Sequence, residues 1–269
     1  MTAKTVLLSA AALAVALGML GAGYAVGARH VSGTVADAVQ ASPAGVGRDD
    51  VELIVRDYLL KNPELLVEVQ AALDAKQKEE QRLAALGVIK HAKADIFNSD
   101  SDGVVGNPNG KVTIVEFYDY NCAYCRHAIQ DMRNLTAADP DLRFVLKEFP
   151  ILGPDSQKAH VVSMAFHKLM PEKYGEFHNR LLGGQGRAGE ASAIKVALSL
   201  GADEAKLREV MKDPAIQAAF EKTYDLANRL AITGTPSYVV GDEVVFGALG
   251  QDVLAQKIAA AKACGDATC

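Results

Sequence analysis

Two cysteines separated by two residues, Cys122 and Cys125, constrain this sequence more than any other feature. They follow Val112 to Tyr118, a nearly continuous apolar and aromatic run that is typical of a strand covered on both faces. From Cys122 to Leu135 the apolar residues recur at helical spacing. The pair is therefore predicted to lie where a buried strand ends and a helix begins.

That position predicts different chemistry for the two thiols. The partial positive charge at a helix N-terminus stabilises an anion, so the first cysteine is expected to ionise readily. A thiolate at Cys122 can attack a sulfur of a substrate and form a mixed disulfide with it. Cys125 lies one helical turn further along and can resolve that bond. The spacing thus predicts a redox-active dithiol with Cys122 as the nucleophile.

Three other uses of the cysteine pair fit the sequence less well. A structural zinc site needs two more ligands, which Cys264 and Cys269 could supply, but their spacing and the strand-to-helix setting are unlike a zinc ribbon. Covalent haem attachment requires His directly after the second cysteine, where this chain has Arg126. A purely structural disulfide would be an unusual staple at a helix opening. We therefore expect no metal and no cofactor.

Glu116 is the only acid in the predicted strand before the cysteines. A carboxylate buried without a partner is costly, so such a residue usually has a partner or a role. Two compatible interpretations remain open: Glu116 relays protons from Cys125, or it forms a buried ion pair with Lys147 on the neighbouring predicted strand. We count Glu116 among the candidate catalytic residues.

Thr235 and Pro236 begin a predicted strand after a long helical stretch. Proline cannot donate a ladder hydrogen bond there, and a cis peptide bond is compatible with the position. This dipeptide gains significance only together with the cysteines.

The N-terminus predicts export. Residues 5–28 contain no charged side chain before Arg29, which suits a signal peptide, but the run is also long enough to span a bilayer. Residues 1–28 are therefore either a cleaved signal or a membrane anchor, and the rest is expected outside the cytoplasm, where disulfides persist. The formal net charge of -5 provides no basic field, so no nucleic-acid partner is expected.

Two segments precede the predicted catalytic domain. Residues 29–47 are rich in small residues and indicate a linker. Residues 48–96 have helical periodicity, interrupted at Pro63, and predict two helices. Because residues 74–82 are almost entirely polar, this segment has too little apolar surface to stand alone. Either it folds back onto the main domain, or it self-associates into a dimer or trimer through Leu66, Val69 and Leu73.

Residues 97–269 are predicted to form the catalytic domain, which begins at a turn-rich boundary over residues 98–110. A helical insertion is expected over about 155–232. The other predicted elements are strands at 112–118, 143–149, 237–240 and 243–246, the last two joined by the hairpin turn Gly241-Asp242, and a final helix at 251–263.

Five motifs carry a resemblance to a known family. They are Ile54-Val-Arg-Asp-Tyr-Leu-Leu-Lys-Asn-Pro-Glu64, Val112 to Tyr118, Cys122-Ala-Tyr-Cys125, Lys147-Glu-Phe-Pro-Ile-Leu-Gly-Pro-Asp-Ser156 and Gly234-Thr-Pro-Ser-Tyr238. With them the chain resembles the DsbA-like disulfide oxidoreductases, closest to the branch named suppressor of copper sensitivity C (ScsC), over nearly all of residues 50 to 263.

The resemblance implies an α/β thioredoxin fold with a helical insertion and an N-terminal helical segment, and a cis Thr235–Pro236 bond beside the dithiol. It further implies a periplasmic role in forming, isomerising or reducing disulfides. The partners would be exported proteins and a membrane redox protein that resets the dithiol. Helix-driven oligomers in that branch favour isomerase or reductase behaviour. Ala123-Tyr124 replaces the Pro-His of the archetypal oxidase, which argues against strong oxidation. The alternative is a copper-binding or holdase module.

The remaining candidates lie outside these motifs. Cys264 and Cys269 at the C-terminal end are expected to form a local disulfide bridge. His160, His167 and His178 fall in the helical insertion without a clear metal-binding spacing, so we interpret them as ordinary helical residues.

Overall fold

The computed structural model describes residues 47–265, so the predicted signal or anchor at 1–28, nearly all of the predicted linker and Cys269 lie outside it. The chain divides into two compact units between Ala71 and Ala72. None of the helices within residues 47–265 is long and apolar enough to cross a bilayer.

The N-terminal helices are α2 (Arg48–Lys61) and α3 (Glu64–His91), separated at Pro63 as predicted. Helix α2 has no buried residue. The C-terminal end of α3 differs, since Ala85 and Ile89 are buried, and so is Ile96 on the short helix α4 (Lys93–Phe97). This end of the helical segment packs on the catalytic domain.

The catalytic domain is built on a five-stranded sheet with the order β1-β3-β2-β4-β5. Strands β2 and β3 are parallel, and the other pairs are antiparallel. Four strands match the predicted ones closely, whereas β1 lies inside the stretch that we predicted as turns. Gly103 on β1 packs directly against the ring of Tyr174, where any side chain would collide. The strands are β1 (Gly103–Gly106), β2 (Val112–Tyr118), β3 (Leu142–Glu148), β4 (Ser237–Val240) and β5 (Glu243–Phe246).

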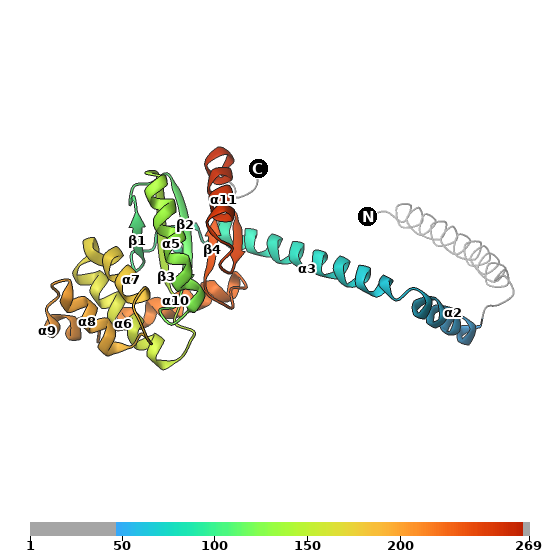
Figure 1. Cartoon of the computed structure of the whole chain (residues 1–269), viewed down its shortest axis with the longest axis horizontal. Helices are drawn as coiled ribbons and strands as arrows, with labels where there is room; N and C mark the ends of the chain where they lie inside the picture. Colours follow the sequence, from blue (N-terminus) through green and yellow to red (C-terminus); the bar gives the residue numbers. More distant parts are fainter. Residues whose placement is uncertain (1–46, 266–269) are drawn as a thin grey trace, which may run out of the picture. The chain divides into compact units, whose positions relative to one another are not determined.

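Helices cover both faces of the sheet (Figure 1). Helices α5 and α11 pack on one face, and α4 and α10 pack on the other. Between β3 and β4 the chain forms the predicted helical insertion, drawn from yellow to orange in Figure 1. The helices that follow β2 are α5 (Ala123–Ala138), α6 (Pro154–Leu169), the 3-10 turn Pro171–Lys173, α7 (Tyr174–Leu182), α8 (Glu190–Ser199), α9 (Glu204–Val210), α10 (Pro214–Arg229) and α11 (Gln251–Cys264).

Side chains alternate between the two faces along β2, and this alternation separates Glu116 from Lys147. Ile114 and Tyr118 belong to the core under α5 and α11, and Phe117 belongs to the core under α4 and α10. Glu116 lies beside Leu146 in the parallel register, and Phe117 lies beside Lys147. Because directly paired residues point to the same face, Glu116 and Lys147 point to opposite faces.

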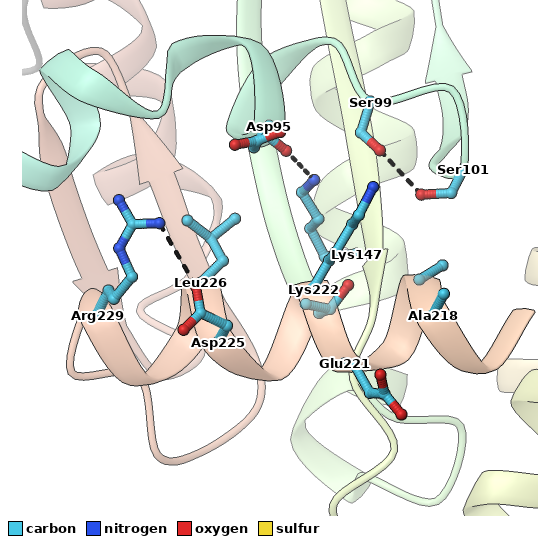
Figure 2. A pocket seen from close by; sticks show the side chains of 12 residues that line it. Asp95, Ser99, Ser101, Lys147, Ala218, Glu221, Lys222, Asp225, Leu226 and Arg229 are labelled. Atoms are coloured by element: carbon cyan, nitrogen blue, oxygen red, sulfur yellow. Dashed lines mark hydrogen bonds and ion pairs between the residues drawn. The ribbon is translucent and has the colours of Figure 1, made fainter. Parts of the chain in front are cut away.

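The predicted ion pair between Glu116 and Lys147 is therefore wrong. Lys147 instead pairs with the buried Asp102, with 2.5 Å between ammonium and carboxylate. Its ammonium also donates to the backbone carbonyl of Asp95. Figure 2 shows the contact between Lys147 and Asp95. It lies in a pocket lined by α4, the segment after α4, and α10, with Lys222 of α10 nearby. The lysine thus ties β3 to the segment that leads into β1.

Candidate active site

The first cysteine caps a helix. Cys122 is the N-cap of α5, and its sulfur accepts the backbone N–H of Cys125 at 3.1 Å. The turn that brings it there is closed by the Cys122 N–H, which donates to the carbonyl of Asp119 at 3.0 Å. An anion at an N-cap satisfies an otherwise unpaired N–H and lies at the positive end of the helix dipole. The predicted junction of strand and helix is confirmed.

The two thiols differ in exposure and in acidity. Cys122 keeps 4 % of its surface open and Cys125 keeps none, so the leading thiol is more covered than its predicted role suggested. Hydrogen bonding from Cys125 lowers the pKa of Cys122 to about 6, against the opposing effect of burial. Burial is the main cause that raises the pKa of Cys125, reinforced by its hydrogen bond to Cys122 and by Glu116. At neutral pH the first cysteine is thus largely a thiolate and the second a thiol.

The strand-opening dipeptide lies against the first thiol. The Thr235–Pro236 peptide bond is cis, as expected. The carbonyl of Thr235 is 3.2 Å from the sulfur of Cys122 and accepts its S–H when the thiol is protonated. The fold therefore brings together the cysteines and a dipeptide more than 100 residues away in sequence.

Glu116 is buried on the same face of the sheet as the dithiol. Within residues 47–265 its carboxyl group has no ion-pair partner. Burial, together with the negative charges of Cys122 and Asp131, raises the pKa of Glu116 to about 8. The charge of Glu116 in turn contributes to the raised pKa of Cys125. A carboxyl group that holds a proton at neutral pH beside a thiol can exchange that proton with it.

Helix α6 has a buried polar face that was not predicted from the sequence. Ser156, His160 and Ser163 recur at spacings of four and three, and all three are fully buried. They contact the segment between β2 and Cys122. The helical spacing of Ser156, His160 and Ser163, which places the three on one face of α6, was the available signal. His160 is therefore a buried, hydrogen-bonded residue rather than an ordinary helical one.

The other sequence candidates lie apart from this site. Cys122 and Cys125 are free thiols, whereas Cys264 is disulfide-bonded. The structure does not describe Cys269, so the predicted bridge between these two residues stays a prediction. In the described part of the chain no three His, Cys, Asp or Glu side chains form a cluster that could hold a metal ion.

Residues 113–259, more than half of the chain, match the DSBA-like thioredoxin domain. The chain belongs to this family of thiol–disulfide oxidoreductases. Residues 48–80 match a second family, the copper resistance protein ScsC N-terminal domain. Both matches confirm the resemblance found in the sequence, and the first confirms the thioredoxin fold.

Two relatives with solved structures match most of this chain. BcfH of Salmonella enterica Typhimurium is 29% identical with a TM-score of 0.69, and the match covers 80% of this chain and 95% of that one. Proteus mirabilis ScsC in a transitional conformation is 27% identical with a TM-score of 0.57, over 80% and 94%.

Curated relatives match over shorter stretches. The thiol:disulfide interchange protein DsbA of Bordetella parapertussis is 28% identical over 49% of this chain and 64% of its own length. Two Na(+)/H(+) antiporters of Salinispora also match, but this chain spans only 22% and 25% of their lengths.

Proposed function

We propose that this chain is a periplasmic thiol–disulfide oxidoreductase that acts on exported proteins with Cys122 as the nucleophile. The observation that carries the proposal is the contrast between the two thiols, one a helix-capping thiolate and the other a buried, protonated thiol. Thiolates, not thiols, attack disulfides, so this contrast fixes the order in which the two sulfurs react. Thr235 and Pro236 would border the substrate at the first sulfur.

The exchange consists of two displacements. The Cys122 thiolate attacks one sulfur of a substrate disulfide, the substrate S–S bond breaks, and the other substrate sulfur leaves as a thiolate. In the mixed disulfide Cys122 carries no negative charge, so one cause of the raised pKa of Glu116 is removed. Cys125 then gives its proton to the ionised Glu116 and attacks the Cys122 sulfur, which releases the second substrate thiolate. Two electrons have passed from the dithiol to the substrate. Oxidation is the reverse, with Glu116 returning the proton to Cys125. Isomerisation follows when another substrate thiolate attacks the mixed disulfide first.

Replacing each cysteine tests the roles separately. Cys122→Ala should abolish reactivation of a scrambled disulfide-containing ribonuclease. Cys125→Ala should instead trap a mixed disulfide with the substrate, visible as a band that a reductant removes. Full activity in the Cys122→Ala protein would refute the proposal.

We infer a preferred direction of exchange from the acidity of Cys122. Its pKa of about 6 lies between those of thioredoxin, about 7, and DsbA, about 3.5. Since a more stable thiolate makes a dithiol more oxidising, we expect a reduction potential between about -270 and -120 mV, which suits isomerisation. Equilibration with glutathione measures it. A membrane redox protein would return the dithiol to its working state.

We further propose that the N-terminal helices join copies of this chain. Eleven large apolar side chains on α2 and α3 expose between 46% and 72% of their surface. Such exposure is unfavourable in water unless a partner covers it. Light scattering should give a dimer or trimer, and Leu66→Glu with Val69→Glu should give a monomer, while Leu198→Glu on α8 should not. The eleven residues are Val51, Leu53, Ile54, Val55, Tyr58, Leu60, Leu66, Val67, Val69, Leu73 and Leu83.

A second candidate function is the binding of cuprous copper by the dithiol. The match of residues 48–80 to a copper resistance protein favours it, and thiolates are the soft ligands that this ion prefers. Titration of the reduced protein with cuprous ion against a competing chelator decides the question. Weak binding that is equal in the wild-type and Cys122→Ala proteins would eliminate this candidate.

A further inference from the structure

The segment Asp119 to Asn121, which leads from β2 into α5, is held by side chains that the exchange reaction does not use. The Asp119 carboxylate accepts the N–H of Leu152 at 2.9 Å and the hydroxyl of Ser156 at 2.8 Å. The Asn121 side chain donates to the carbonyl of Ala188 and accepts its N–H, at 2.9 and 2.7 Å. The segment is thus fixed at both ends to the helical insertion.

The backbone amide in the middle of this segment is held by one imidazole. The backbone N–H of Tyr120 donates to Nε2 of His160 at 3.1 Å, and both residues are fully buried. A ring nitrogen that accepts a hydrogen bond carries a lone pair and no proton. His160 in this arrangement is therefore neutral, with its proton on Nδ1.

Glu148 at the end of β3 fixes that tautomer. One of its oxygens accepts the Nδ1 proton of His160. The other accepts the hydroxyls of Ser163 at 2.7 Å and Tyr174 at 2.9 Å. These three donated hydrogen bonds favour the ionised form of Glu148. A carboxylate at this place keeps the Nδ1 of the ring protonated and leaves Nε2 as the acceptor.

We propose that His160 is a positioning residue for Cys122, because it holds the Tyr120 amide and with it the turn that sets the sulfur at the N-cap of α5. The inference rests on the proposed function, in which Cys122 is the nucleophile. Tyr120 lies two residues before Cys122, and the turn between them closes on the carbonyl of Asp119. Without His160 a buried N–H loses its acceptor, and the turn rearranges to find another. The sulfur then loses its alignment with the N–H of Cys125.

The pH dependence of Cys122 alkylation by iodoacetamide tests the proposal, with mass spectrometry to localise the modification. His160→Leu should raise the midpoint by about one pH unit, a tenfold loss in the ratio of thiolate to thiol. His160→Gln, whose amide oxygen can accept the Tyr120 N–H, should recover at least half of that shift.

His178→Leu is the matched control. His178 is also buried and packs against Tyr118, with ring centroids 4.6 Å apart, but its Nδ1 has no hydrogen-bond partner within residues 47–265. This variant should lower stability and leave the alkylation midpoint in place. An equal shift in His178→Leu, or no shift in His160→Leu, overturns the proposal.

A second measurement needs no variant of His160. Nitrogen chemical shifts of the native protein at neutral pH should show a protonated Nδ1 and a lone pair on Nε2. The Asp119 carboxylate lies 4.0 Å from Nε2 and would favour a second proton there. A ring protonated on both nitrogens, or on Nε2 alone, overturns the proposal. These outcomes are independent of the proposed function, which fails instead if Cys122→Ala retains exchange activity.

Discussion

On one face of the central sheet Lys147 is buried with Asp102 at 2.5 Å, while on the other face Glu116 is buried without an ion-pair partner in the described chain. Burial raises the pKa of both carboxyl groups, to about 6 for Asp102, where Lys147 offsets part of the effect, and to about 8 for Glu116. At neutral pH the first is therefore mainly ionised and the second mainly protonated.

We propose a different role for each buried charge. The pair of Lys147 and Asp102 joins β3 to the segment before β1, so its role is architectural. Glu116 holds a proton that can move, and it lies in the electrostatic environment of Cys122 and Cys125. A buried carboxyl group without an ion-pair partner weakens the fold, and such groups with shifted pKa values cluster at functional sites, which supports the proposed proton transfer by Glu116.

The largest effect is expected on the paired face. Lys147→Met leaves the buried carboxylate of Asp102 without its cation, which should lower the free energy of unfolding by about 3–5 kcal/mol. Urea denaturation of the reduced protein at pH 7 measures the loss. The folded variant should keep the alkylation midpoint of Cys122. If the loss is below 1 kcal/mol, about the value of an exposed pair, Lys147 is not an architectural residue.

On the other face of the sheet, Glu116→Gln should lower the rate at which Cys125 resolves the mixed disulfide. Without a proton acceptor, Cys125 should attack the mixed disulfide about 100-fold more slowly, the lower range for general acid–base catalysis. Stopped-flow kinetics of glutathione release from the Cys122 mixed disulfide measure this step. Lys147→Met is the control and should release glutathione at the wild-type rate when it is folded. Equal rates in Glu116→Gln and wild type would exclude a proton relay.

Local signals predicted much of this molecule. Strands β2, β4 and β5 were read from apolar runs and the Gly241-Asp242 turn, and the helix start at Cys122 from its spacing. The face of Lys147 was not predictable in this way, because a shift of one residue in register moves a side chain to the other face. Register depends on how two strands pair, and the sequence of either strand alone does not contain that information.

Two further misses have the same physical origin. Strand β1 was not predicted because a glycine such as Gly103 indicates a turn. In the structure glycine is needed at this position because the ring of Tyr174, from a helix distant in sequence, leaves no room for a side chain. The contact of His160 with Tyr120 spans 40 positions, and no local pattern contains both residues. What could not be predicted here are the contacts between elements, and these contacts also fix the geometry of the dithiol.

The third prediction concerns pH. The folded pKa of Glu116, about 8, lies above the unfolded value of 4.5, so the native state binds the extra proton and its stability falls as pH rises through this window. The penalty is at most about 1.4 kcal/mol per pH unit. Above pH 6 Asp102 is mainly ionised, so of the two carboxyl groups, Asp102 and Glu116, only Glu116 still titrates.

Comparison with Glu116→Gln isolates the Glu116 contribution from that of Cys122. The lowered pKa of Cys122 acts in the opposite sense, since its thiolate gains stability between about pH 6 and 9 in both proteins. The stability of Glu116→Gln relative to wild type should therefore increase from pH 6 to pH 8 in urea denaturation of the reduced forms. A constant difference would place the pKa of Glu116 outside this range.

The smallest effect is expected when both members of the architectural pair are removed. Lys147→Met costs several kcal/mol only because the charge of Asp102 stays behind, and Asp102→Leu removes that charge. The free energy of unfolding of the double variant should therefore lie within about 1 kcal/mol of the wild-type value. To this is added the cost of the lost hydrogen bond to the carbonyl of Asp95. A double-mutant cycle by urea denaturation at pH 7 measures the coupling. If the double variant is as unstable as Lys147→Met, the stabilising contribution of Lys147 comes from its packing and its bond to Asp95, and the contrast between the two faces is one of shape rather than of charge.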